Sequence, residues 1–150
     1  MKTVYADTSV FGGCFTEKFK YYSTKLMQEI KRGKLKLMIS ELVMLELEKA
    51  SKEIRTQPLT IPYLHVIQTK SPAKAFILAD KYIAGGALSN KSYADAVHIA
   101  TATLQGADIV ASWNFKHMVN VDKIKLFNII NTNAGFRKIK IMTPHEILNP

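Results

Sequence analysis

The chain contains 150 residues, 47% of them hydrophobic and 22% charged, which fits a single globular domain over residues 1–150. Lys and Arg number 21 against 12 Asp and Glu, and the resulting net charge of +9 suits a polyanionic partner. The single cysteine, Cys14, excludes an internal disulfide and a multi-cysteine zinc site. Neither a membrane-spanning run nor the apolar core of a signal peptide is present, so we expect a soluble, cytoplasmic protein with no membrane partner.

The first half of the chain predicts strands that alternate with helices. The predicted strands are residues 2–6 and 34–40, and the predicted helices are residues 21–33 and 40–53. A short loop with two glycines is expected after the first strand. Ser40 is a natural N-cap for the helix that it opens. Prolines make residues 56–71 a connector, with a short extended piece at residues 64–68.

The second half continues the alternation. The predicted helices are residues 72–86 and the Ala-rich segment 93–107, followed by a short helix with a loop over 121–135 and a last helical turn at 143–148. The predicted strands are residues 108–112 and 138–142. Strands that alternate with helices indicate a mainly parallel sheet with helices on both faces.

The stretch YADTSV, residues 5–10, places Asp7 at the end of the first predicted strand. Asp, Thr and Ser often form turns because their side chains hydrogen-bond nearby backbone groups. The same position is where parallel sheets hold ligand-binding groups, just outside the carboxyl ends of the strands. Asp7 alone does not decide between these two roles.

Two further acids occupy helix positions that should face the core. Glu46 shares its helical face with Leu42 and Val43, and Asp95 lies in the first turn of a helix that is apolar nearly all round. A carboxylate in such a position costs several kcal/mol unless it is paired, protonated or bound to a metal.

Asp7, Glu46 and Asp95 have no obvious basic partner nearby in the sequence, and two interpretations follow. Each acid is satisfied separately, Asp7 in a turn, Glu46 by a distant Lys or Arg, and Asp95 as a helix cap. Alternatively, the three acids converge, because hard oxygen ligands from several elements are what Mg²⁺ or Mn²⁺ requires. In a basic chain, the second interpretation favours cleavage of a phosphodiester.

Four motifs occur in a characteristic order. They are VYADTSV, ISELVMLELEK, YADAVHIATA and DIVASWNFKHM. Their order and spacing resemble the PIN-domain ribonucleases, which include the toxins of many bacterial toxin–antitoxin pairs, and the resemblance runs over nearly the whole chain. It implies a three-layer α/β/α sandwich with a mainly parallel central sheet, RNA as substrate, one or two Mg²⁺ or Mn²⁺ ions, a cognate antitoxin and a homodimer.

The resemblance assigns catalysis and metal binding to Asp7, Glu46 and Asp95. The family pattern often has a fourth acid after the third core strand, where this chain has Asn114 and His117. Asn offers a neutral oxygen, and His a nitrogen less suited to Mg²⁺. The second metal site of the pattern is therefore incomplete here.

Several other side chains are candidates for substrate contact or for support of the acids. They are Ser9, Asn114, Lys116 and His117. Ser9, with Thr8, fits a turn equally well, Asn114 fits a loop cap, and His117 fits an exposed position.

Residues beyond this set are interpreted mainly as structural. We interpret His98 as a core histidine bonded to backbone; because it lies one helical turn after Asp95, orientation of that acid or contact with substrate is the alternative. Trp113 is interpreted as a packing residue, with base stacking as the alternative. Arg137 and Lys138 are candidate contacts to backbone phosphates.

Two other functions fit parts of the sequence. The first is a catalytically weak or inactive PIN-like protein that binds nucleic acid or a protein partner. The second is a phosphatase with Asp7 as covalent nucleophile, but the haloacid dehalogenase-like pattern requires a second Asp where this chain has Ser9. A dinucleotide site is disfavoured because no G-x-G-x-x-G follows the first strand.

Overall fold

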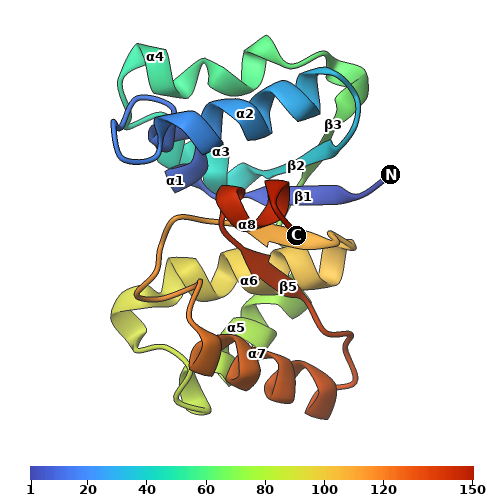
Figure 1. Cartoon of the computed structure of the whole chain (residues 1–150). Coiled ribbons are helices and arrows are strands. Elements are labelled where there is room, and N and C mark those ends of the chain that lie inside the picture. Colours follow the sequence, from blue (N-terminus) through green and yellow to red (C-terminus); the bar gives the residue numbers. More distant parts are fainter.

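The computed structural model describes all residues from Met1 to Pro150 and shows a three-layer α/β/α sandwich (Figure 1). The central sheet has five strands in the order β3-β2-β1-β4-β5, and every neighbouring pair is parallel. The strands are β1 Thr3–Ala6, β2 Lys36–Ser40, β3 Val66–Thr69, β4 Ile109–Ala111 and β5 Lys140–Met142. The predicted fold class is confirmed.

Helices cover both faces of this sheet. Figure 1 shows α2, α3 and α4 on one side and α5, α6 and α7 on the other. The helices are α1 Thr8–Gly13, α2 Lys20–Lys31, α3 Glu41–Leu47, α4 Lys52–Arg55, α5 Ala73–Ala84, α6 Tyr93–Gln105, α7 Val121–Asn133 and α8 Pro144–Leu148. Short 3-10 turns occur at Gln57–Thr60, Tyr63–His65 and Asn90–Ser92. None of these helices combines the length and apolar character that crossing a membrane requires.

The register of the central strands brings the ends of three strands to one edge of the sheet. Tyr5 of β1 pairs with Met38 of β2, and Ala6 pairs with Ala111 of β4. The residues that follow each strand therefore emerge side by side at the carboxyl edge. β1 is also the point where the strand order reverses, the usual ligand-binding position in open parallel sheets.

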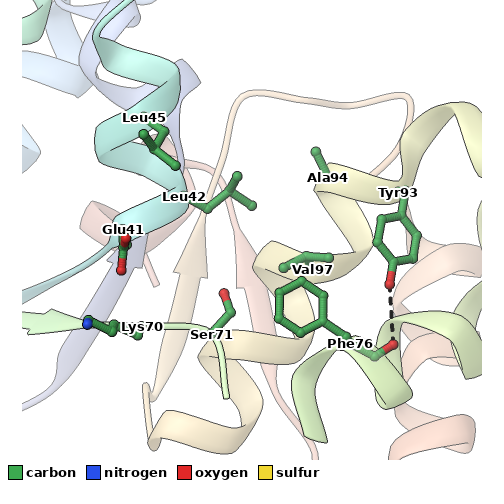
Figure 2. Close-up of a pocket in the computed structure, with 9 residues that line it drawn as sticks. All are labelled: Glu41, Leu42, Leu45, Lys70, Ser71, Phe76, Tyr93, Ala94 and Val97. Carbon is green, nitrogen blue, oxygen red and sulfur yellow. Dashed lines mark hydrogen bonds between the residues drawn. The ribbon is translucent and has the colours of Figure 1, made fainter. Parts of the chain in front are cut away.

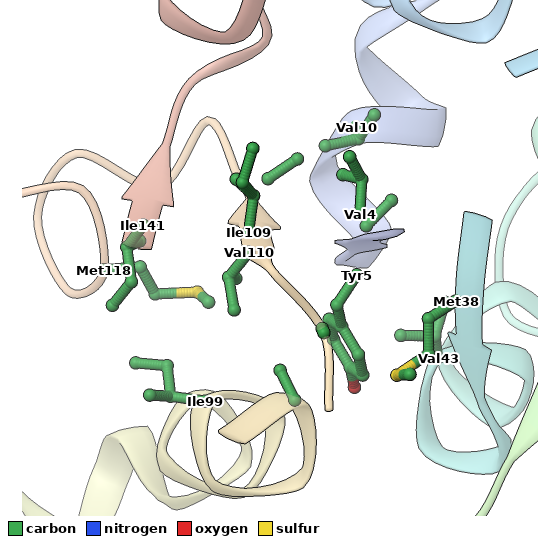
Figure 3. Close-up of a cluster of buried hydrophobic side chains, with 14 of the residues drawn as sticks. Val4, Tyr5, Val10, Met38, Val43, Ile99, Ile109, Val110, Met118 and Ile141 are labelled. Atoms are coloured by element: carbon green, nitrogen blue, oxygen red, sulfur yellow. The ribbon is translucent and has the colours of Figure 1, made fainter. Parts of the chain in front are cut away.

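A single core of 34 buried residues joins the sheet to both helical layers. Figure 3 shows Val4, Ile99 and Val110 among the side chains of this core. Several alanines of α6 are fully buried, which lets this helix pack closely against its neighbours. The phenol of Tyr5 also lies in the core and is the one side chain in Figure 3 that carries an oxygen.

The structure corrects several predicted elements. Residues 8–13 form helix α1 and not a loop, because the side chain of Asp7 caps its first turn by accepting a hydrogen bond from the Ser9 amide. The predicted helix over residues 40–53 ends at Leu47, and a separate turn, α4, follows. Its predicted N-cap is confirmed, since Ser40 Oγ accepts from the Val43 amide.

Two further segments are more regular than predicted. The short helix expected within residues 121–135 is the 13-residue α7, whose first turn is capped by the Asn120 side chain. The extended piece within the connector is confirmed, and it forms β3 at the edge of the sheet beside β2.

Candidate active site

Asp7 follows β1 at the carboxyl edge and is almost fully buried, with 5% of its surface exposed. Its Oδ1 accepts hydrogen bonds from the Ser9 amide at 3.1 Å and from Ser9 Oγ at 2.6 Å, and its Oδ2 accepts from Ser112 Oγ at 2.6 Å. Burial raises the pKa of Asp7, and these hydrogen bonds oppose the rise. Asp7 thus caps a helix, and its role as a ligand-binding group stays a prediction.

Glu46 projects from α3, and 33% of its side chain is exposed. Its Oε1 accepts hydrogen bonds from Thr8 Oγ1 at 2.5 Å and from His98 Nε2 at 2.8 Å. Burial alone would raise the pKa of Glu46, but the hydrogen bonds from His98 and Thr8 lower it. The partner of Glu46 is therefore a histidine, and not the Lys or Arg considered from the sequence.

His98 lies in the middle of α6 with 2% of its surface exposed. It is a buried histidine as predicted, but the predicted bond to backbone is wrong. Its Nδ1 is 2.6 Å from the Tyr5 hydroxyl, and its Nε2 faces Glu46. Its ring also lies near enough to Asp7 and Asp95 to affect the pKa of both acids. His98 is thus the one residue next to all three predicted site acids.

Asp95 lies in the first turn of α6 and is half-buried. Burial raises its pKa, the charge of Glu46 adds to the rise, and the neighbouring His98 and His117 oppose it. Its Oδ2 is 3.4 Å from Asn114 Nδ2, a long and weak hydrogen bond. Asp95 is thus more accessible than the core position predicted for it.

The segment after β4 joins Asp7 to Asp95. Ser112 Oγ donates to Asp7 and accepts from the Asn114 amide at 2.9 Å, and Asn114 in turn reaches Asp95. The Trp113 amide donates to Ser9 Oγ at 2.9 Å. Ser112 is a site residue that the sequence did not reveal, because it was interpreted only as the end of a strand.

The remaining predicted contacts are placed differently by the structure. Asn114 caps the following turn, as its Oδ1 accepts from the His117 amide at 3.0 Å, while its amide group faces Asp95. Lys116 is exposed and His117 half-buried beside the acids. Arg137 is not free for phosphate, because its guanidinium donates to the main-chain carbonyls of residues 102, 103 and 107 around the end of α6.

Trp113 is a packing residue, as predicted. Its ring stacks on Phe19 with centroids 4.4 Å apart, and its Nε1 donates to Ser23 Oγ at 2.8 Å. Only 9% of Trp113 is exposed. Base stacking on its ring is therefore disfavoured.

Three solved structures share this architecture. VapC20 of Mycobacterium tuberculosis, a toxin that cleaves the sarcin-ricin loop, aligns with a TM-score of 0.56 at 14% identity over 91% of this chain and 98% of that one. VapBC2 of Rickettsia felis, bound to a promoter DNA fragment, gives 0.53 at 13% identity over 94% and 98%. FitAB bound to an IR36 DNA fragment gives 0.57 at 11% identity over 94% of each chain. The chain has a VapC-like PIN fold. No family model and no curated protein matches the sequence, so the likeness is one of structure.

The carboxylate oxygens of Asp7, Glu46 and Asp95 are of the chemical kind that suits a hard divalent cation. No three His, Cys, Asp or Glu side chains lie close enough together to complete a metal site on their own. Yet the charge of Asp95 raises the pKa of Asp7, and the charge of Glu46 raises that of Asp95. No Lys or Arg forms an ion pair with any of the three. Mg²⁺ commonly uses one or two carboxylates together with water and substrate oxygens, and such an ion fits these donors.

An apolar groove lies beside the acids of the PIN fold, between α3 and the α5–α6 pair (Figure 2). Its volume is about 440 Å³, and Leu42, Leu45, Phe76 and Val97 contribute to its lining. None of the three acids lines it, although Glu46 and Asp95 come from helices that form its walls. The groove is therefore a neighbour of the acidic site and not the site itself.

Proposed function

We propose that the chain is a divalent-metal-dependent endoribonuclease that hydrolyses RNA phosphodiester bonds, with Asp7, Glu46 and Asp95 as the catalytic ligands of Mg²⁺ or Mn²⁺. One observation carries the proposal. Acids from three separate elements lie close enough for Asp95 to affect the pKa of Asp7 and for Glu46 to affect that of Asp95, and none has a Lys or Arg ion-pair partner, in a chain whose net charge is +9. A cation is the partner that this arrangement lacks.

The structural neighbours support RNA as the substrate class. VapC20, which shares the fold, is a toxin that cleaves the sarcin-ricin loop. An excess of basic residues also favours a polyanion over a neutral or cationic substrate. Lys116 and His117 lie on the segment that reaches Asp95, and we propose that they contact the substrate backbone.

The side chains of the site hold its acids in fixed positions. Ser9 and Ser112 bind both oxygens of Asp7, while Thr8 and His98 bind Oε1 of Glu46 and leave Oε2 without a protein partner. When bound, a divalent ion would supply phosphate polarisation and an activated water. No protein nucleophile is required. Attack by Asp7 itself is disfavoured, because both of its oxygens accept hydrogen bonds and it is almost fully buried.

Purified protein should cut single-stranded RNA in the presence of Mn²⁺ or Mg²⁺ and should stop doing so with EDTA. Asp7→Asn and Asp95→Asn should abolish cleavage, because each removes a charged oxygen ligand and keeps the shape of the side chain. Asp122→Asn, an exposed acid in the first turn of α7, is the matched control and should cleave as the wild type does. Cleavage that survives both site variants would refute the proposed site.

The incomplete metal set favours one alternative, a PIN-like protein that binds nucleic acid or a protein but cleaves weakly or not at all. Asn114 stands where relatives often have a fourth acid, and here it contributes an amide group toward Asp95. RNA binding without cleavage, at Mn²⁺ concentrations that saturate the protein, would favour this alternative. The same assay thus separates the two functions.

The proposed partners of the chain include a cognate antitoxin protein. The VapBC2 and FitAB structures, which share the fold, both hold DNA fragments. We propose that the product of an adjacent open reading frame binds this chain, and that the chain forms a homodimer. Co-purification with that product tests the first proposal, and light scattering of the chain alone tests the second.

A further inference from the structure

The hydroxyl of Tyr5 belongs to a hydrogen-bonded chain that runs from the core to the acidic site. Tyr5 has no exposed surface, and its ring packs among the apolar side chains of Figure 3. Its Oη is 2.7 Å from Ser40 Oγ and 2.6 Å from His98 Nδ1. His98 Nε2 is 2.8 Å from Glu46 Oε1. Four residues that are distant in sequence therefore form one continuous path.

The contacts at the two ends of this path set the direction of every hydrogen bond within it. At the outer end Oε1 of Glu46 also accepts from Thr8 Oγ1, and a carboxylate oxygen has no proton to give, so His98 Nε2 must donate. A neutral imidazole has one donor and one acceptor nitrogen, and its Nδ1 is then the acceptor. The hydroxyl of Tyr5 must donate to that nitrogen, since its proton is the one available for this 2.6 Å contact.

The inner end agrees with this direction. The Val43 amide donates to Ser40 Oγ at 3.1 Å, which leaves the Ser40 hydroxyl proton free to point to Tyr5 Oη. Ser40 thus donates to Tyr5, Tyr5 donates to His98, and His98 donates to Glu46. In this arrangement each buried polar atom of the path has a partner, which is the condition for burying such groups without a large cost.

We infer that Ser40, Tyr5 and His98 are positioning residues, which fix the imidazole as its Nε2–H tautomer and hold Oε1 of Glu46 so that Oε2 faces the ligand. Thr8 Oγ1 supports the same oxygen from the other side of the site. The inference rests on the proposed metal role of Glu46. It assigns a function to a core tyrosine that has no contact with the acids, and it explains why the most buried histidine of the chain carries no backbone hydrogen bond.

Removal of the Tyr5 hydroxyl should change the orientation of the Glu46 carboxylate, at the outer end of the path. In Tyr5→Phe, His98 Nδ1 loses its only hydrogen-bond donor, so the two neutral tautomers become closer in energy. In the Nδ1–H form the lone pair of Nε2 faces the Glu46 carboxylate and repels it. The carboxylate then turns away from the orientation that a ligand requires.

Tyr82→Phe is the matched control. Tyr82 is a second fully buried tyrosine, and its hydroxyl donates to Asn131 Oδ1 of α7, with no hydrogen bond to the three acids or to His98. Both substitutions remove one buried, hydrogen-bonded hydroxyl and keep the ring. A difference between the two variants therefore reports the path and not the general loss of a buried hydroxyl.

The first measurement is the tautomer of His98, read from the imidazole nitrogen resonances of ¹⁵N-labelled, metal-free protein at about pH 8, above the ordinary histidine pKa. The chain has four histidines, and the signals lost in His98→Gln assign the relevant pair. Wild type and Tyr82→Phe should show the Nε2–H tautomer alone, and Tyr5→Phe should show both tautomers. An Nδ1–H tautomer or a mixture in the wild type would overturn the inference.

The second measurement is Mn²⁺ affinity, followed by the electron paramagnetic resonance of the free ion. Tyr5→Phe should weaken binding by about tenfold, in the range that loss of a supporting hydrogen bond to a metal ligand produces. Tyr82→Phe should bind as the wild type does. Equal affinities in all three proteins would overturn the positioning role, even with the predicted tautomer present. A wild type that binds no Mn²⁺ but has the predicted tautomer would instead refute the proposed function and leave the hydrogen-bond path intact.

Discussion

The two fully buried tyrosines of the chain belong to polar clusters that end differently. Tyr82 of α5 donates to Asn131 of α7, whose Nδ2 donates in turn to Asn128 Oδ1 at 3.3 Å. Asn128 also binds both main-chain groups of Ile139, at 2.8 Å and 3.0 Å. This cluster contains only neutral groups, and it closes on the main chain.

The cluster of Tyr5 ends instead on a carboxylate. It passes through His98 to Glu46, a third of whose side chain is exposed at the acidic edge. A closed neutral network stabilises the fold because each group has a partner. Glu46 has an oxygen, Oε2, without a protein partner, and proteins retain such groups where a ligand completes them. We propose that the cluster of Tyr82 serves packing and that the cluster of Tyr5 serves binding.

The largest expected effect comes from placing a charge in the neutral cluster of Tyr82. Asn131 is fully buried, and in Asn131→Asp a carboxylate would face Asn128 Oδ1, which is also an acceptor. We expect urea unfolding to show a loss of about 3–5 kcal/mol, typical of an uncompensated buried charge. Asn133→Asp, at the exposed end of the same helix, should change stability by less than about 0.5 kcal/mol. Equal losses of unfolding free energy in the two variants would mean that the cluster of Tyr82 tolerates a buried charge.

The converse change removes the charge from the cluster of Tyr5. In Glu46→Gln the side-chain carbonyl still accepts from Thr8 and His98, so stability should stay within about 0.5 kcal/mol of the wild type. RNA cleavage should fall by about a hundredfold, or about 2.7 kcal/mol in transition-state free energy, because a charged ligand is lost. Single-turnover cleavage at saturating Mn²⁺ measures this fall. The exposed Glu48→Gln should be unaffected, and a similar fall there would point to a general charge effect.

The fold could largely be predicted from the sequence, because its signals are local. Helix α6 ends at Gly106 in the left-handed conformation with φ 87°, a stop that its position after an Ala-rich run indicates. The predicted elements are wrong where a side chain outside a segment determines the structure of that segment. Residues 8–13 contain two glycines and read as a loop, yet the acid before them caps a helix.

The positions of the site acids could also be predicted, because carboxylates on apolar helical faces are unusual in any fold. Their partners could not. Glu46 and His98 are 52 residues apart in the chain, and Asp7 and Ser112 are 105 apart. Helical periodicity correctly buries His98 but does not show which side chain faces it across the sheet. Such pairs depend on strand order, which no local pattern specifies.

A smaller effect should appear in the stability of the metal-free protein. Asp7→Asn removes a buried acid whose pKa burial raises, and Asn retains the N-cap preference at this position. We expect the variant to be more stable than the wild type at pH 7 by about 0.5–2 kcal/mol, as for other stabilising changes at functional sites. Urea unfolding in EDTA measures the difference. A destabilised variant would show that the ionised Asp7 side chain stabilises the folded protein.

The smallest effect is the pH dependence of the difference in unfolding free energy between Asp7→Asn and the wild type. The folded-state pKa of Asp7 lies above the unfolded value of about 3.9, so the folded protein binds the proton more tightly. Its contribution to stability is then complete below the unfolded pKa and is lost as the pH rises through the folded pKa. Asp95 behaves in the same way, whereas Glu46, whose pKa is lowered, contributes above its unfolded value and loses that contribution in acid.

The advantage of Asp7→Asn over the wild type should therefore grow as the pH rises above the unfolded value of about 3.9, because only the wild type has to deprotonate a buried acid. Unfolding curves at intervals of one pH unit in EDTA would measure it, and Asp122→Asn should follow the wild type throughout. Saturating Mn²⁺ should reduce the advantage, since an ion that binds the folded wild type stabilises it in proportion to its occupancy. A difference in unfolding free energy that stays constant with pH would mean that the variant acts through packing. The cluster of Tyr5 would then differ from the cluster of Tyr82 in exposure, but not in holding an acid whose ionisation the fold opposes.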